Sequence, residues 1–352
     1  MAPVVRELER HPELRSEVCV TAQHREMLDQ VLHLFGIRPD YDLDLMRPEQ
    51  TLSQITARVF EQLDPVVAKV QPDWVLVQGD TTTVMAASLV AYYHHARVGH
   101  VEAGLRTGQR YEPFPEEINR RVASVVADLH FAPTERARQN LLREGVPAAS
   151  IHVTGNPVID ALHWAADLPY VPDAGPLAGL PWGARLVLVT AHRRENLGQP
   201  LEEICLGLRD LAERFGAGLH IVYPVHLNPQ VQRTAHRVLD DVPNVTLLAP
   251  LDYQPLVYLM KHAALVLTDS GGIQEEAPGL GVPVLVLRDV TERPEAVEAG
   301  TVRLVGPHRE AIVAEASRLL EDPIAHASMA RAVNPYGDGH AAQRIVAALL
   351  AA

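Results

Sequence analysis

Short apolar runs alternate with helix-like segments along nearly the whole chain, and this alternation restricts the possible folds more than any other feature of the sequence. The runs lie at 18–22, 74–78, 98–101, 129–133, 151–155, 186–191, 219–224, 245–250, 264–270 and 283–287. Most of them are continuously apolar, which is typical of strands that helices cover on both faces. The chain is therefore expected to be an α/β protein with parallel sheets.

Two domains are expected, since 352 residues exceed the length of a usual compact domain. The segment 168–183 is rich in Pro and Gly and interrupts the alternation, so we interpret it as a linker. An N-terminal Rossmann-like domain is expected at 1–165 and a C-terminal one at 184–335. The remaining segment, 336–352, ends in an Ala-rich helix.

The net charge of -13 argues against a nucleic-acid or membrane-surface partner, because both are polyanionic. No apolar run reaches the length of a membrane span and no signal peptide opens the chain, so a cytoplasmic location is expected. Cys19 and Cys205 lie in apolar contexts and are expected to be buried, reduced thiols. No spacing of His or Cys residues indicates a metal site.

Acidic residues follow two predicted strands in the first half of the chain. Asp80 comes soon after the strand 74–78, and Glu102 directly after the strand 98–101. Ligands of open α/β sheets bind beyond such carboxyl ends. Glu116 and Arg120 then lie four apart on one face of a predicted helix. Carboxylates that converge in this way can have separated pKa values and share acid and base work.

Simpler structural roles exist for the same residues. Asp80 can be the N-cap of the helix that follows it. Glu116 and Arg120 can form an ordinary ion pair on the helix surface. The convergence of carboxylates from adjacent loops at one sheet edge favours a site over these roles.

The second half of the chain carries residues suited to a phosphate group. His192 and two arginines follow one strand, and the turn Ser270-Gly271-Gly272 follows another. Such a turn at a helix start can present backbone N–H groups to a pyrophosphate. Glu276 lies about one and a half turns into that helix, where a carboxylate can bind ribose hydroxyls. Together these residues predict a nucleotide bound to the second domain.

Eight motifs in one order resemble those of the non-hydrolysing UDP-N-acetylglucosamine 2-epimerases. They are QGDTTT (78–83), HVEAGLRTG (100–108), PEEINRR (115–121), TGNPVID (154–160), AHRREN (191–196), YPVHLNP (223–229), TDSGGIQEEAP (268–278) and TERPEAV (291–297). The resemblance implies the GT-B architecture, in which two Rossmann-like domains enclose an active site in the cleft between them. It also implies that the C-terminal helix packs back on the first domain.

The resemblance implies an enzyme that interconverts UDP-N-acetylglucosamine and UDP-N-acetylmannosamine through 2-acetamidoglucal and UDP. Asp80, Glu102 and Glu116 would handle protons at C2 of the sugar, and His192 would stabilise the departing diphosphate. The UDP would be bound by Ser270, Gly271, Gly272, Glu276, Arg293 and Arg120. A second, activating molecule of UDP-N-acetylglucosamine would contact Gln23, His24 and His226. The family also implies a homodimer that needs no cofactor and no metal.

Three other functions remain open on the sequence alone. A hydrolysing epimerase would release N-acetylmannosamine and UDP from the same intermediate. A GT-B glycosyltransferase would have a similar UDP-binding half, although the carboxylate cluster argues against it. A non-catalytic regulator that binds nucleotide sugars is the third alternative.

The beginning of the chain departs from the family pattern, which opens with a strand and a G-T-R-P-E-A-I-K turn just before the M-A-P helix. This sequence begins at that Met. We expect a further strand and a basic turn ahead of Met1, because the runs 18–22 and 74–78 have the pattern of strands that need neighbours.

Overall fold

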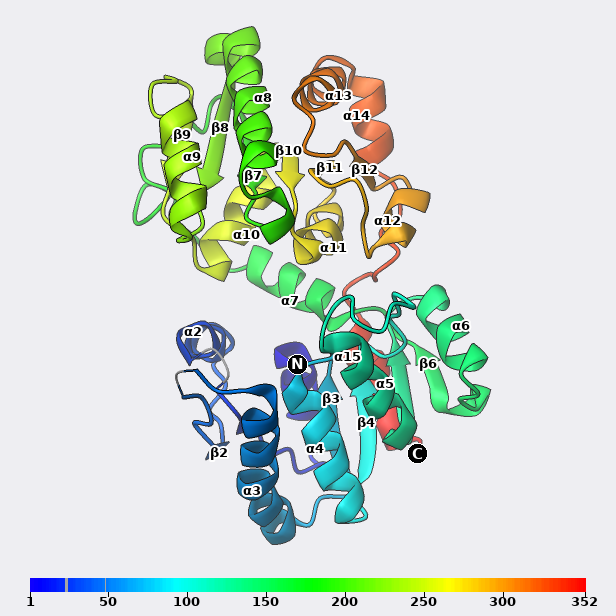
Figure 1. The fold of residues 1–352 in the computed structure, drawn as a ribbon. Helices are drawn as coiled ribbons and strands as arrows, with labels where there is room; N and C mark the ends of the chain where they lie inside the picture. The colour runs from blue at the N-terminus through cyan, green and yellow to red at the C-terminus, as the bar shows by residue number, and fades with distance from the viewer. Residues whose placement is uncertain (23–24, 48) are drawn as a thin grey trace. The chain divides into compact units, whose positions relative to one another are not determined.

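A computed structural model describes residues 1–22, 25–47 and 49–352 of the chain. The chain forms two compact bodies, one made of Met1–Ala161 with Tyr336–Ala352 and the other of Leu162–Pro335. The division falls within helix α7 (Pro157–Ala166), ahead of the Pro- and Gly-rich segment 168–183. Each body is built on parallel strands with helices around them, so the predicted fold class is confirmed (Figure 1).

The main sheet of the first body has four parallel strands in sequence order. They are β3 (Trp74–Gln78), β4 (Arg97–Val101), β5 (Leu129–Ala132) and β6 (Ile151–Val153). Gln78 lies opposite Val101 in the register of β3 and β4, so these two strands end side by side. The residues that follow them, which include Asp80 and Glu102, therefore begin from one edge of the sheet.

Helices cover both faces of this sheet. Val59, Val90 and Ala123 belong to a buried cluster on one face, whereas Val4, Phe131 and Ile345 belong to another cluster that includes the two terminal helices. The helices of this body are α1 (Ala2–Leu8), α2 (Arg25–Phe35), α3 (Leu52–Val70), α4 (Thr82–Tyr93), α5 (Glu116–Val126), α6 (Glu135–Arg143), the short η1 (Ala148–Ser150) and α15 (Ala341–Leu350). Helix α15 contacts α1, so the end of the chain is part of the first body.

A separate pair of short parallel strands, β1 (Cys19–Val20) and β2 (Tyr41–Asp42), completes the first body. In the part of the chain that the structure describes, β1 pairs only with β2, and β3 pairs only with β4. The further strand expected beside 18–22 and 74–78 stays a prediction. Cys19 is exposed, contrary to expectation, since it occupies the exposed position of the two-residue strand β1, whereas Val20 is buried.

The sheet of the second body has six parallel strands in the spatial order β12-β11-β10-β7-β8-β9. They are β7 (Arg185–Thr190), β8 (Leu219–Pro224), β9 (Val245–Leu248), β10 (Ala263–Thr268), β11 (Val284–Val286) and β12 (Val302–Leu304). The chain starts in the middle, builds outward to β9, and then returns to build outward on the other side from β10. This order places a topological switch point between β7 and β10, where α/β proteins bind their ligands.

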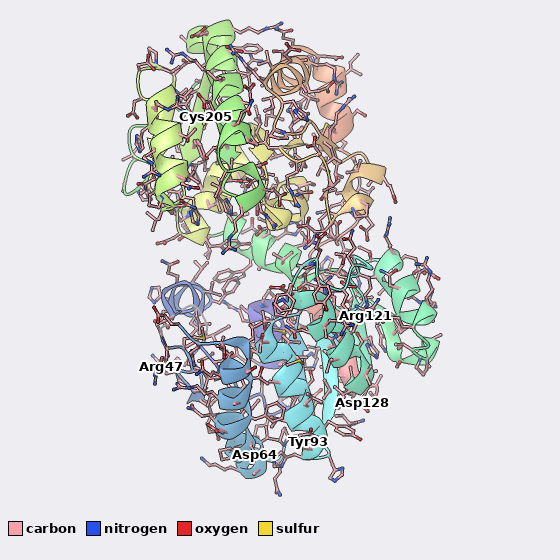
Figure 2. All side chains as sticks on the ribbon, viewed as in Figure 1. Arg47, Asp64, Tyr93, Arg121, Asp128 and Cys205 are labelled. Carbon is pink, nitrogen blue, oxygen red and sulfur yellow. The ribbon has the colours of Figure 1, made fainter. Side chains whose placement is uncertain are left out.

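The helices of the second body also lie on two faces. Helices α8, α9 and α13 share a buried cluster with the sheet. Cys205 of α8 belongs to this cluster and is buried, as expected (Figure 2). Helix α10 lies against β7 and β10, and α11 against β10 and β11. The helices are η2 (Arg194–Asn196), α8 (Gln199–Phe215), η3 (Gly216–Gly218), α9 (Pro229–Leu239), α10 (Tyr253–His262), α11 (Gly271–Gly279), α12 (Pro294–Glu298), α13 (Arg309–Glu321) and α14 (Pro323–Ala330).

Candidate active site

Asp80 lies just beyond the carboxyl end of β3 and is held by an arginine from α5. Helix α4 is capped by the side chain of Thr81, which accepts a hydrogen bond from the backbone N–H of Val84 at 3.3 Å. The alternative role of Asp80 as the N-cap is therefore wrong. Its Oδ2 instead accepts a hydrogen bond from Nη2 of Arg120 at 2.5 Å.

Glu102 follows β4 in an unusual backbone conformation. Its φ of 62° lies in the left-handed region, which is uncommon for residues with a side chain and is frequent at functional sites. The turn directs the side chain toward the end of β3, since a Cβ added to Gly79 would lie 3.5 Å from Oε2 of Glu102. The carboxylate of Glu102 thus lies beside the backbone that precedes Asp80.

Glu117 connects the loop after β4 to the first turn of α5. Its side chain is fully buried and accepts hydrogen bonds from the backbone N–H groups of Thr107 at 3.1 Å and Gly108 at 3.2 Å. It also lies 3.6 Å from Nη1 of Arg120. Arg120 in turn donates to the carbonyl of Leu105 at 3.2 Å and is only 8% exposed. This placement favours a role for Arg120 in holding Asp80.

Glu116 begins α5 and is half-buried. The ion pair between Glu116 and Arg120 that their spacing allowed is not formed, because the guanidinium of Arg120 is turned to Asp80 and the loop. Among the described residues Glu116 has no hydrogen-bond or ion-pair partner. Residues four apart share a helix face, so Glu116 lies on the side of α5 from which Arg120 reaches Asp80.

His100 supports the same strand end from inside the protein. Its buried ring donates from Nε2 to the carbonyl of Gly79 at 2.8 Å. Burial lowers the pKa of His100 to about 4, so the ring is neutral at pH 7 and fixes the turn before Asp80. Sequence reasoning assigned no role to His100 or Glu117. A histidine in an apolar strand next to a site motif is the signal that could have identified His100.

Asp269 joins the two loops at the switch point of the second body. Its fully buried carboxylate accepts hydrogen bonds through Oδ2 from the backbone N–H groups of His192 and Arg193, both at 2.8 Å, and from Nδ2 of Asn196 at 3.0 Å. The loop after β7 is therefore tied to the end of β10. Charge-assisted hydrogen bonds of this kind hold backbone firmly.

His192 is partly exposed above Asp269. Its ring stacks on that of His226 with centroids 5.1 Å apart, and its Nδ1 lies 3.7 Å from Oδ1 of Asp269. Burial lowers the pKa of His192, the charge of Asp269 opposes this effect, and His226 and Arg193 add to it. The ring is therefore mainly neutral at pH 7. Gln23 and His24, which were predicted to share a second binding site with His226, lie outside the described residues.

Ser270, Gly271 and Gly272 form the start of α11 next to the switch point. Ser270 is the N-cap, but its side chain makes no capping hydrogen bond. The first N–H groups of a helix have no partner within the helix, and an anion can accept from them. This helix start can therefore receive a phosphate group.

Glu276 lies in the same helix, with its Oε2 3.6 Å from the position of a Cβ added to Gly272. Its Oε1 accepts a hydrogen bond from the hydroxyl of Tyr253 at 2.7 Å. Burial raises the pKa of Glu276 to about 7, although the Tyr253 hydrogen bond lowers it. Arg293, which was predicted to contact UDP, donates from Nε to the buried Glu275 at 2.5 Å.

The described residues contain neither a metal-binding cluster nor a membrane-spanning helix. No group of three or more His, Cys, Asp or Glu residues among them is arranged to hold a metal ion. None of their helices combines the length and apolar character that crossing a membrane requires.

Known proteins resemble this chain over nearly its full length. The family model described as UDP-N-acetylglucosamine 2-epimerase matches residues 6–350. A Yersinia pestis protein named UDP-N-acetylglucosamine 2-epimerase is 56% identical over 355 aligned positions, covering 99% of this chain and 94% of that protein. The crystal structure of UDP-GlcNAc 2-epimerase from Neisseria meningitidis bound to UDP-GlcNAc matches with a TM-score of 0.91 at 49% identity and covers 100% of this chain and 96% of that one.

A more distant likeness concerns the fold alone. The glycotransferase of kitacinnamycin matches with a TM-score of 0.66 at 14% identity, covering 99% of this chain and 94% of that one. The two-body α/β architecture is thus shared with a glycosyltransferase, as the GT-B expectation implied.

Proposed function

Because this chain belongs to the UDP-N-acetylglucosamine 2-epimerase family, we propose that it interconverts UDP-N-acetylglucosamine and UDP-N-acetylmannosamine by eliminating UDP and adding it back. The structural observation that supports this best is the pair of carboxylates, Asp80 and Glu102, at adjoining strand ends. An epimerase must remove a proton from one face of a carbon and return one to the other face, which requires at least two proton-handling groups.

Elimination is the route that the chemistry of the sugar favours. The C2 hydrogen has no neighbouring carbonyl group and is not acidic. When the bond between C1 and the oxygen of the β-phosphate breaks, positive charge develops on the ring and the C2 proton can pass to a carboxylate. The products are 2-acetamidoglucal and UDP. In the reverse step the phosphate oxygen attacks C1 while a proton arrives at the other face of C2.

The first body would carry the proton transfers. Asp80, Glu102 and Glu116 are the groups that we assign to this work, with Arg120 and His100 as positioning residues around Asp80. The hydrogen bond from Arg120 orients the carboxylate of Asp80, and His100 fixes the carbonyl of Gly79 just before it. Glu116, which has no partner among the described residues, is open to contact a substrate.

The second body would hold the UDP. The start of α11 at Ser270, Gly271 and Gly272 suits the diphosphate, and Glu276 suits the ribose. His192 would donate to the departing phosphate, whose negative charge grows as the bond breaks.

Incubation with UDP-N-acetylglucosamine in deuterated water, followed by NMR, tests this function. We expect UDP-N-acetylmannosamine with deuterium at C2. Release of free N-acetylmannosamine would instead identify a hydrolysing enzyme. The absence of any product would contradict catalysis on this substrate.

Activation by a second molecule of UDP-N-acetylglucosamine is a finer part of the proposal. The stacking of His226 on His192 supports it, because a ligand that contacts His226 would touch a group next to the proposed phosphate site. Turnover of pure UDP-N-acetylmannosamine should then begin only after a trace of UDP-N-acetylglucosamine is added. Full initial turnover without the trace would exclude such activation.

We also propose that the chain forms a homodimer. Tyr92 and Tyr93 at the end of α4 are 59% and 62% exposed, and aromatic residues are enriched at protein interfaces. Analytical ultracentrifugation should give twice the mass of the 38.6 kDa chain. Sedimentation as a monomer at micromolar concentration would contradict the dimer.

A further inference from the structure

The carboxylate of Glu292 lies beside the first residue of α11, next to the helix start where a phosphate group is proposed to bind. A Cβ added to Gly271 would lie 2.7 Å from Oε1 of Glu292 and 3.4 Å from Nη2 of Arg193. The space beside the first residue of this helix therefore already contains an anionic oxygen and an arginine. Glu292 comes from the loop between β11 and α12, and no catalytic or binding role has been given to it above.

Two arginines hold this carboxylate with different strength. Nη1 of Arg288 donates to Oε2 at 2.6 Å, and the side chain of Arg288 is only 9% exposed. Nη2 of Arg193 donates to Oε1 at 3.3 Å, and the side chain of Arg193 is 38% exposed. Arg288 thus fixes Glu292 in place, whereas Arg193 is held loosely and can turn toward an incoming phosphate.

The charges around Glu292 keep it ionised. Burial acts to raise its pKa, but its backbone hydrogen bond and the charge of Arg288 lower the pKa below the usual value overall. A fixed negative charge therefore faces the helix start at neutral pH. A diphosphate that binds to the same N–H groups and to Arg193 must approach this charge and share Arg193 with it.

Competition between Glu292 and the diphosphate for Arg193 would serve the proposed reaction. UDP is both the leaving group and the nucleophile that returns, and its β-phosphate gains negative charge when the bond to C1 breaks. A purely positive pocket would bind free UDP so tightly that the enzyme would stall with UDP and the glycal in place. The negative charge of Glu292 weakens the binding of free UDP, so that UDP can add back to C1.

We propose that Glu292 sets the affinity of the site for UDP by competing with the diphosphate for Arg193 and the N-terminus of α11. This inference rests on the proposed function, because it assumes that UDP binds at Ser270, Gly271 and Gly272. It assigns Glu292 as a specificity-determining residue that weakens binding of the separated UDP relative to the intact UDP-sugar.

The test is the Kd for UDP, measured by isothermal titration calorimetry on the native chain and on Glu292→Gln. The amide keeps the shape of the side chain but removes its charge, so we expect UDP to bind roughly tenfold more tightly or better, with a lower kcat. Inorganic diphosphate, used as a second probe, should also bind more tightly to Glu292→Gln than to the native chain. A residue that only positions Arg193 would give the opposite result, because its loss would weaken binding.

Glu195→Gln is the matched control. Glu195 also pairs with Arg288, whose Nε donates to Oε1 of Glu195 at 2.5 Å. The side chain of Glu195 is 51% exposed, and none of its atoms is among those nearest to a Cβ added to Gly271. We expect this variant to change the Kd for UDP by less than about twofold, as is usual for an exposed ion pair. Glu292→Asp keeps the charge, and UDP should not bind to it more tightly than to the native chain.

The outcomes separate this inference from the function on which it rests. Tighter UDP binding by Glu292→Gln alone supports the inference. Unchanged or weaker binding by that variant, with normal binding by the native chain, overturns the inference and leaves the proposed function standing. Failure of the native chain to bind UDP overturns both.

Discussion

His192 has a position in which its effect should increase during the reaction. Its backbone is fixed by Asp269, and its neutral ring stacks on His226 beside the start of α11. A donor to a phosphate that gains charge contributes more in the transition state than in the ground state. The role of His192 is therefore best tested by kinetics rather than by affinity.

We expect His192→Ala to lower kcat by roughly a hundredfold to a thousandfold, which corresponds to about 2.7–4 kcal/mol, with little change in KM. Steady-state rates at saturating UDP-N-acetylglucosamine measure this. A raised KM with an unchanged kcat would mean that His192 only helps to bind the substrate.

Glu276 should make the stability of the protein depend on pH. Burial raises its pKa from 4.5 to about 7, so between these values the folded protein keeps a proton that the unfolded chain has lost. The stability that the protonated carboxyl contributes is fully present below about pH 4.5 and is lost as the pH rises through about 7. A neutral amide at position 276 does not ionise, so it would not lose this contribution to stability as the pH rises.

We therefore expect Glu276→Gln to become more stable relative to the native protein by about 3 kcal/mol between about pH 4.5 and about pH 8. Urea unfolding without nucleotide, followed by tryptophan fluorescence, gives the difference at each pH. A difference that stays constant across this range would show that Glu276 ionises normally in the folded protein.

At the scale of the element, the segment from β4 to α5 places two adjacent glutamates in opposite surroundings. Glu117 is fully buried and holds two backbone N–H groups of the loop, whereas Glu116 is half-buried and has no partner among the described residues. The sequence could not separate them. Polar residues line the buried side of α5 at Asn119 and Arg120, so hydrophobic periodicity does not reveal which glutamate points inward.

The two neighbours should respond oppositely to the same substitution. Glu117→Gln should cost about 1–3 kcal/mol of stability, because an amide has one acceptor oxygen where Glu117 uses two, so one buried backbone N–H loses its partner. Glu116→Gln should leave the free energy of unfolding within about 0.5 kcal/mol but lower kcat roughly a hundredfold or more. Thermal unfolding and initial rates on both variants decide this. Full activity in Glu116→Gln would remove it from the mechanism.

Strand positions could be predicted from the sequence where a strand lies within a continuous apolar run, even where the strand is as short as β1. Each of the ten predicted runs contains a strand. The strands β2 and β12 were missed, because each contains a charged residue, Asp42 or Arg303, and lies in no continuous apolar run. The left-handed turn at Glu102 was also beyond prediction, since it depends on the packing of that loop rather than on the residue type.

At the scale of the whole molecule, two bodies divide the proposed work between them. The carboxylates at the ends of β3 and β4 belong to the first body, and the switch point between β7 and β10 belongs to the second. The sequence could predict that functional residues follow strand ends, because parallel strands all point to one edge of their sheet. It could not predict the competing contacts of Arg120 and Glu292, which bring together residues far apart in the chain.

The proposed reaction requires that the bond between C1 and the phosphate oxygen breaks during each turnover. Positional isotope exchange measures this most directly, with oxygen-18 placed in the bridge between C1 and the β-phosphorus of UDP-N-acetylglucosamine. We predict that the label spreads to the non-bridging oxygens of the β-phosphate at a rate comparable to epimerisation, because the freed phosphate can rotate before it returns. Epimerised product that keeps all of its label in the bridge would contradict the elimination mechanism.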